Sequence, residues 1–106
     1  MRTVWKFTML YQLDVVATWS IPAGARLVHV APDVVEPGSL SQPALAAWFE
    51  VDTEADREIR VFEVFGTGHP IPDGAGEYRG TIREGWLVIH LYERTFGSDE
   101  RESDTP

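Results

Sequence analysis

Residues 58–65 read EIRVFEVF, the most strand-like run in this chain of 106 residues. The run is rich in β-branched and aromatic residues, which favours a β-strand. A connection of eleven residues, 66–76, follows it and begins GTGHPIPDG. Hairpin loops usually have two to five residues, so a connection of this length needs a reason. This part of the sequence therefore predicts a strand and, directly after it, a special site.

Six further runs, four before this strand and two after it, are also predicted to form strands. Turns rich in glycine, proline and acidic residues separate them at regular spacing. Residues 44–51 open with ALAA, which would suit a short helix, but Pro43 and Asp52 bracket them and they end in WFEV, which favours a strand. The six runs are residues 2–11, 15–21, 25–31, 44–51, 77–83 and 86–93.

Seven short strands without a long helix predict an all-β fold. We expect a single-domain antiparallel β-sandwich or small barrel of about seven strands, spanning residues 1–96. Residues 36–43 have the composition of a loop, and the charged residues 97–106 predict an acidic disordered tail. The length allows a modest hydrophobic core, and the absence of cysteine excludes disulfides and cysteine-based zinc sites.

The formal net charge of −8 limits the classes of partner. Residues 97–106 contain four acidic residues and one arginine, so residues 1–96 still carry a net charge of −5. An acidic surface repels phosphates, which disfavours general binding of DNA or RNA. No run approaches the length of a membrane span, and the N-terminus lacks the apolar core of a signal peptide. The sequence therefore predicts a cytoplasmic protein that does not bind membranes.

The last two predicted strands provide one face for a ligand site. If residues 84–85 form a two-residue turn, Arg79 lies opposite His90 and Thr81 opposite Val88, all on one face. The glycine-rich connection returns to the sheet at the far end of this face. Its backbone amides, an arginine and a histidine could hold a small anionic ligand there. The candidate ligand-binding residues are Gly66, Thr67, Gly68, His69, Arg79, Thr81 and His90.

The same residues also have plainer interpretations. The face could be an ordinary solvated sheet surface with one arginine–tryptophan stack. Gly66 and Gly68 could serve only to provide positive φ in a compact loop. The connection lacks the Gly-Lys-Ser/Thr ending of a P-loop, and it lacks the third glycine and following helix of a dinucleotide fold.

Signals for metal binding and catalysis are weak. Three histidines, His29, His69 and His90, are the minimum for a three-histidine metal site, but no HxH or HxxxH spacing supports one. No serine lies in a nucleophile elbow. The sequence predicts no metal, no cofactor and no catalytic residue. An enzyme built on His69, His90 and an acidic partner such as Asp73 remains an alternative.

The predicted strands contain more apolar residues than are needed to bury one face of each sheet. Residues 45–49 are apolar at positions that point to both faces of a strand. A two-layer sandwich buries one face of each sheet, so the surplus predicts a homo-oligomer or a partner interface, with Trp48 and Trp86 as candidate interface residues. A thick core under long loops is the alternative.

Several short motifs occur together in this chain. FGTGHPI at residues 65–71 is followed by YRGT at 78–81 and LVIHLYE at 87–93, and TVWKF at 3–7, PAGA at 22–25, LVHV at 27–30 and AW at 47–48 accompany them. In this combination, residues 1–93 resemble an uncharacterised family of small proteins from tailed bacteriophages and prophages. The resemblance implies a phage accessory protein acting inside a bacterial cell. It also implies that the family pattern includes Gly66, Thr67, Gly68, His69, Thr81 and His90, and it implies no catalytic role.

These observations favour a non-enzymatic accessory binding protein that can form a homo-oligomer. It would bind a host protein or sequester a small anionic ligand such as a nucleotide signal. A structural or assembly protein of the phage particle is the alternative function, since an oligomeric β-sandwich would serve there too.

Overall fold

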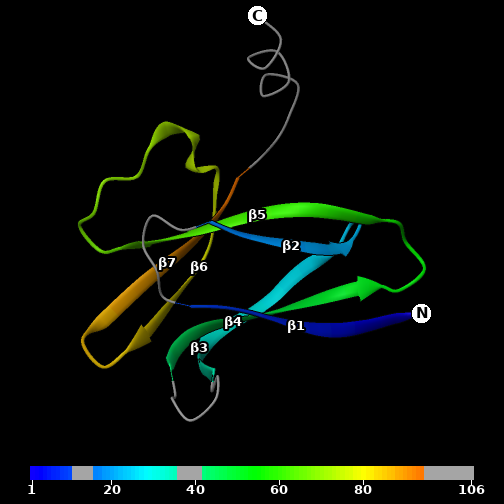
Figure 1. Cartoon of the computed structure of the whole chain (residues 1–106), viewed down its shortest axis with the longest axis horizontal. Helices are drawn as coiled ribbons and strands as arrows, with labels where there is room; N and C mark the ends of the chain where they lie inside the picture. Colours follow the sequence, from blue (N-terminus) through cyan, green and yellow to red (C-terminus); the bar gives the residue numbers. More distant parts are fainter. Residues whose placement is uncertain (11–15, 36–41, 95–106) are drawn as a thin grey trace, which may run out of the picture.

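The computed structural model describes residues 1–10, 16–35 and 42–94 of the chain (Figure 1). The prediction of an all-β fold is confirmed, because these residues form seven strands and one short 3₁₀ turn, with no α-helix among them. The elements are β1 (Arg2–Leu10), β2 (Ala17–Pro22), β3 (Arg26–Val35), β4 (Gln42–Asp52), β5 (Arg57–Gly66), η1 (Asp73–Ala75), β6 (Glu77–Glu84) and β7 (Leu87–Glu93).

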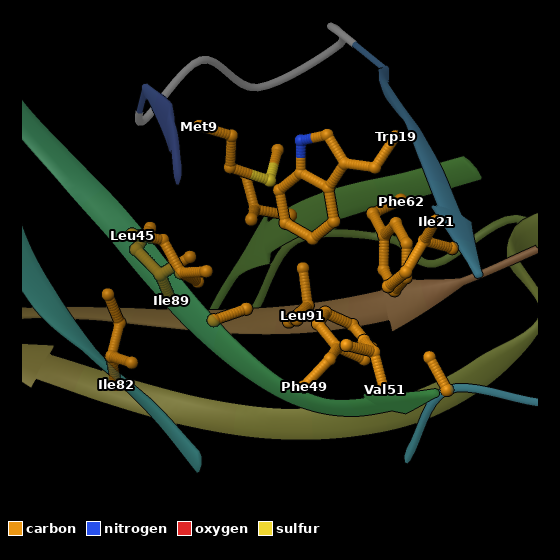
Figure 2. Packing of buried hydrophobic residues seen from close by; sticks show 13 residues of the cluster. Met9, Trp19, Ile21, Leu45, Phe49, Val51, Phe62, Ile82, Ile89 and Leu91 are labelled. Carbon is orange, nitrogen blue, oxygen red and sulfur yellow. The ribbon is translucent and has the colours of Figure 1, made fainter. Parts of the chain in front are cut away.

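The strands form two antiparallel sheets. The three-stranded sheet has the order β1-β4-β3, and the four-stranded sheet has the order β2-β5-β7-β6. Buried residues of both sheets form one hydrophobic cluster, so the sheets pack as a small β-sandwich (Figures 1 and 2). Three of the five strand pairings, β1 with β4, β2 with β5 and β5 with β7, join strands that do not follow one another in the sequence.

The core is centred on Trp19 of β2, which lies between the two sheets (Figure 2). Its ring centroid lies 5.2 Å from that of Phe7 and 4.6 Å from that of Phe62. Phe49 meets it edge-on, with the centroids 6.1 Å apart. Such aromatic pairs add about 0.5–1.5 kcal/mol each beyond the burial of their area. Trp19 and Phe62 come from one sheet and Phe7 and Phe49 from the other, so this cluster holds the layers together.

The apolar surplus of residues 45–49 has a cause within the single chain. β4 is the central strand of its sheet, and Ala44 and Ala46 are fully buried although they belong to its outer face. The Lys6 ammonium of β1 reaches across β4 to the Asp33 carboxylate of β3, at 2.5 Å. Lys6 also lies over the ring of Trp48, 5.7 Å from its centroid. The apolar run is thus explained by Ala44 and Ala46, whose small side chains lie under the Lys6–Asp33 ion pair. A homo-oligomer stays a prediction.

The predicted boundaries need small corrections. Residues 44–51 form a strand, as predicted, but β4 begins at Gln42, two residues inside the predicted loop. Gln42 and Pro43 pair with Val35 and Val34 of β3, which extends the strand past the proline. The predicted strand ends at Tyr11 and Val15, residues 36–41 of the predicted loop and the tail at 97–106 lie outside the described residues.

The predicted turn of the last hairpin is wrong by one residue, which changes the partner of each residue next to the turn by two. Glu84 pairs with Leu87, so the turn is formed by Gly85 and Trp86. Gly85 has a φ of 62°, which the first position of a tight hairpin turn favours and which Glu84 would adopt only with strain. Thr81 therefore pairs with His90, where Val88 was expected.

A close approach of β3 and β6 joins the edges of the two sheets. A Cβ added to Gly80 of β6 would lie 2.8 Å from the Cγ2 methyl of Val30 on β3. The strand register also shifts between Tyr78 and Gly80, which leaves Arg79 as the extra residue of a β-bulge. Both features lie beside the residues that carry the site described below.

We expect Gly76→Ala to destabilise the fold strongly. Gly76 has a φ of 96°, and a Cβ there would collide with the carbonyl oxygen of Glu93. Backbone strain and overpacking together should lower the free energy of unfolding by roughly 3 kcal/mol. Gly85→Ala is the matched control, because Gly85 also has positive φ but open space around it, and it should cost about 1 kcal/mol. Urea denaturation measures both, and equal losses would contradict the proposed collision.

Candidate functional site

A chain of hydrogen bonds lies on the outer face of the four-stranded sheet, centred on His90 of β7. Thr67 Oγ1 lies 2.8 Å from His90 Nε2, and Thr81 Oγ1 lies 2.9 Å from His90 Nδ1. The Tyr78 hydroxyl lies 2.5 Å from Thr81 Oγ1. Both ring nitrogens of His90 are thus engaged, and four side chains from β6, β7 and the connection after β5 hold one another in place.

Aromatic rings border this chain. Tyr92 follows His90 by two residues and therefore lies on the same face of β7. Its ring meets Phe65 of β5 and Tyr78 of β6 edge-on, with centroids 5.4 Å and 5.7 Å away. We call the set Phe65, Thr67, Tyr78, Thr81, His90 and Tyr92 the outer-face cluster.

The glycine-rich connection begins with a compact turn. The His69 amide donates to the Gly66 carbonyl at 3.1 Å, and Gly68 has a φ of 85°. The His69 ring packs over Gly66, where a Cβ would lie 3.2 Å from ring atoms. Gly68 thus provides positive φ, as the plainer interpretation of the sequence expected, whereas Gly66 has no positive φ and instead leaves room for the His69 ring. Thr67, inside the turn, is the residue that reaches His90.

The predicted ligand site is therefore only partly assembled. Thr67, Thr81 and His90 come together, with Gly66, Gly68 and His69 in the adjoining turn. Arg79 does not lie beside His90, as the predicted register required, because the bulge turns it towards Glu93 at the edge of the core.

Arg79 belongs to a partly buried ion cluster with Arg60 and Glu93. Arg60 of β5 binds the Glu93 carboxylate with two parallel bonds, Nε to Oε2 at 2.6 Å and Nη2 to Oε1 at 2.9 Å. Arg79 donates from Nε to Glu93 Oε1 at 2.8 Å. Arg60 also donates from Nη1 to the Ala25 carbonyl at 2.7 Å, and its guanidinium lies 5.3 Å from the Phe49 ring centroid. The cluster joins three strands of one sheet to the chain that enters β3.

The ion cluster changes the acidity of its members. Burial alone would raise the pKa of the Glu93 carboxyl, but hydrogen bonds from Arg60 and Arg79 outweigh it and lower that pKa from its ordinary value of 4.5. The hydrogen bond to Glu93 raises the pKa of Arg60. Glu93 and Arg60 are therefore charged near neutral pH, and the guanidinium groups of Arg60 and Arg79 share one buried carboxylate.

A depression of about 570 Å³ opens beside this ion cluster. It lies where the turn between β2 and β3 meets β5 and β6. We call it the arginine cleft, and its lining consists of Arg26, Arg60 and Arg79 with Gly24, Ala25, Leu27 and Tyr78.

Sequence reasoning did not single out Arg60 and Glu93, although a signal for them exists. Arg60 precedes Phe62 by two residues, and Glu93 follows Leu91 by two. Because alternate residues of a strand share a face, both charged side chains occupy positions on the core side. A charge at such a position needs a partner, and two opposite charges on different strands predict an ion pair.

The other predicted residues lie apart from both sites. Trp48 is half-buried on the outer face of the three-stranded sheet, with its ring 5.6 Å from that of His29. His29 and His90 thus lie on the outer faces of different sheets. Trp86, in the turn between β6 and β7, is 89% exposed. Within residues 1–10, 16–35 and 42–94, no three acidic, histidine or cysteine side chains gather closely enough to hold a metal ion.

Comparison with known proteins gives one match. A family model described as "Domain of unknown function (DUF7352)" matches residues 1–102. No curated protein and no solved structure matches the chain. The expected resemblance to an uncharacterised family is thus confirmed at that level, and its phage origin stays a prediction. No helix in the described part of the chain is long and apolar enough to cross a membrane.

The Glu93 ion cluster should make stability depend on acid pH. The folded pKa of Glu93 lies below its ordinary value, so its contribution is complete above about pH 4.5 and is lost as the pH falls through the folded pKa. Glu93→Gln should lower the free energy of unfolding at pH 7 by about 3 kcal/mol, because it leaves Arg60 buried without its anion. Below pH 4.5 the difference between wild type and variant should shrink.

Urea denaturation across this pH range measures the effect. Asp33, Glu50 and Asp52 also have lowered pKa values, so the comparison rests on the difference between two proteins, which cancels their shared contribution. Glu84→Gln, at the exposed end of β6, is the control and should follow the wild-type curve. Parallel curves for Glu93→Gln and wild type would contradict the assigned role.

Proposed function

The chain belongs to the DUF7352 family, and we propose that it is a non-enzymatic accessory protein that binds a partner protein. The binding surface is the outer face of the four-stranded sheet. The observation that carries this proposal is the apolar and aromatic character of that face, which no other layer of the described chain covers.

The outer face of the four-stranded sheet carries more apolar side chains than is usual for a sheet face that only contacts water. On β5, Phe62 and Val64 point into the core, so the alternate positions Ile59, Val61 and Phe65 point outwards. Ile59 is 62% exposed and Tyr78 is 54% exposed. Contiguous exposed apolar side chains of this kind mark interaction surfaces. The apolar and aromatic residues of this face are Ile59, Val61, Phe65, Tyr78, Val88 and Tyr92, and the polar ones include Thr81, His90, Arg83 and the ion pair of Glu63 with Arg94 at 2.9 Å.

The outer face of the three-stranded sheet carries more ion pairs, although Val4 there is 52% exposed. Lys6 of β1 pairs with Asp33 of β3 across β4, and Arg26 pairs with Glu50 at 2.9 Å. Such a face is compatible with water on its own. The contrast between the two faces supports docking on the four-stranded sheet.

The outer-face cluster is also pre-ordered for binding. The hydrogen bonds from Tyr78 through Thr81 to His90, and from Thr67 to His90, restrict the rotamers of all four side chains. Association then costs less side-chain entropy. Tyrosine and tryptophan are frequent among the residues that carry binding energy, and the exposed Trp86 lies in the turn next to this face.

The arrangement around His90 supports a binding role over an enzymatic one. A histidine-based enzyme would join His69 or His90 to an acidic partner such as Asp73. In the structure, both ring nitrogens of His90 bond to threonine hydroxyls, and the His69 ring packs on Gly66.

The setting of this activity is part of the same proposal. The sequence resemblance to phage and prophage proteins supports an accessory protein in the cytoplasm of a bacterial host, with a host protein as the partner. The net charge of −8 supports a protein partner over a nucleic acid, because the surface as a whole repels phosphates.

Substitutions on the two outer faces test the docking surface. Ile59→Asp and Tyr78→Ala should each weaken partner binding by roughly tenfold or more, because each removes an exposed apolar contact from the face. Val4→Asp is the matched control, since Val4 is 52% exposed on the three-stranded sheet, and it should change affinity less than about twofold.

The partner is first captured by cross-linking in expressing cells and identified by mass spectrometry. Affinity is then measured with both proteins purified. Equal weakening by Val4→Asp and Ile59→Asp would contradict the assigned face. Light scattering on the purified chain tests whether the face instead binds a second copy of this chain. Self-association that is lost in Ile59→Asp would show such binding and would overturn the proposal of a host partner.

A further inference from the structure

The arginine cleft is a second potential binding site, which shares Tyr78 with the outer face of the sheet. It gathers three of the eight arginines of an acidic chain around one depression of about 570 Å³. That volume falls within the range of small-molecule sites. Leu27 and Tyr78 add apolar surface to the wall beside the guanidinium groups.

The arginines retain hydrogen-bonding capacity that faces no protein acceptor. A guanidinium has five N–H donors. Within the described residues, Arg60 uses three of them, two for Glu93 and one for Ala25, which leaves two. Arg79 uses one for Glu93 and one for Glu77, which leaves three. An oxyanion is the ligand class that such forked donors recognise best.

Glu93 holds these donors in place without saturating them. Its side chain is only 8% exposed, and its single negative charge is shared between Arg60 and Arg79. The three groups together carry one net positive charge at the edge of the core. The Arg60 guanidinium is further restrained by the Ala25 carbonyl and by the Phe49 ring, so this part of the cleft is rigid before any ligand arrives.

Glu77 has a different relation to the same arginine. Its side chain is 62% exposed and lies 3.0 Å from Arg79 Nη1. It pairs with Glu93 in the register of β6 and β7, so Arg79 lies between two carboxylates, one buried and one exposed. An exposed ion pair of this kind is worth little and opens readily. Glu77 lies outside the lining of the cleft, so an oxyanion in the cleft would compete with it for Arg79.

We propose that the arginine cleft binds the phosphate or carboxylate group of a small metabolite. Arg60 and Arg79 supply the forked donors, Glu93 positions them, and Glu77 is an internal anion that the ligand displaces. Arg26, whose side chain is 68% exposed and pairs with Glu50, lies at the other side of the cleft and closes on the ligand.

The test is a titration followed by nuclear magnetic resonance, with the full chain at pH 7 and constant ionic strength. The probes are inorganic phosphate and succinate, which distinguish the two kinds of oxyanion. We expect saturable shifts at the amides of Gly24, Ala25 and Arg26 and at the Nε–H groups of Arg60 and Arg79. Arg79→Ala should weaken binding roughly tenfold or more, because it removes charge-assisted bonds.

Two further variants sharpen the result. Arg83→Ala is the matched control, because it removes the same charge from the outer face of β6 and should change the affinity less than about twofold. Glu77→Gln should strengthen binding by roughly threefold, since it removes the competing anion but keeps the fold. This variant leaves the core untouched, so it remains informative if Arg79→Ala is poorly folded.

Each outcome decides the matter. Saturable shifts at the cleft that weaken in Arg79→Ala and strengthen in Glu77→Gln support the site, and the tighter probe identifies the oxyanion. Equal weakening by Arg79→Ala and Arg83→Ala would mean a general charge effect and would overturn it. An absence of saturable shifts with both probes up to about 20 mM, in wild type and in Glu77→Gln alike, would also overturn it. None of these results depends on the protein partner proposed for the outer face.

Discussion

The buried carboxylate of Glu93 is the constraint on which much of this structure depends. It binds Arg60 of β5 and Arg79 of β6 from its own strand β7, and Arg60 in turn binds the Ala25 carbonyl just before β3. One carboxylate thus ties three neighbouring strands to the other sheet, at the end of the sandwich where the aromatic core stops. A charge in such a place is tolerated only when it is paired, so the strands must keep this register.

The fold followed from the sequence because its signals are local. Alternating apolar residues and the glycine and proline turns indicate where strands begin and end, and β4 was recognisable although its opening alanines would suit a helix. The candidate site was harder to predict from the sequence, because it depends on which residues pair across neighbouring strands. A turn at Gly85 and Trp86, one residue later than predicted, moves the partner of Thr81 by two residues, from Val88 to His90.

The bulge at Arg79 had no sequence signal that would separate it from an ordinary strand residue. Strict alternation puts Arg79 and Thr81 on one face, which is why a single site with His90 was expected. The extra residue between Tyr78 and Gly80 breaks that alternation. Tyr78 then keeps to the outer face with Thr81, while Arg79 turns to Glu93. The bulge therefore divides one expected site into an aromatic outer face and an arginine cleft.

This division bears on what an acidic protein can bind. Arginines on an open sheet face would meet a polyanion such as nucleic acid, whose further phosphates the net charge of −8 would repel. Arginines held at the edge of the core by Glu93 meet only what enters a depression of about 570 Å³. A single phosphate or carboxylate group gains their donors there without placing further charges against the acidic surface. The outer face, where Arg83 and the Glu63–Arg94 ion pair lie among apolar and aromatic side chains, is left for contact with a protein.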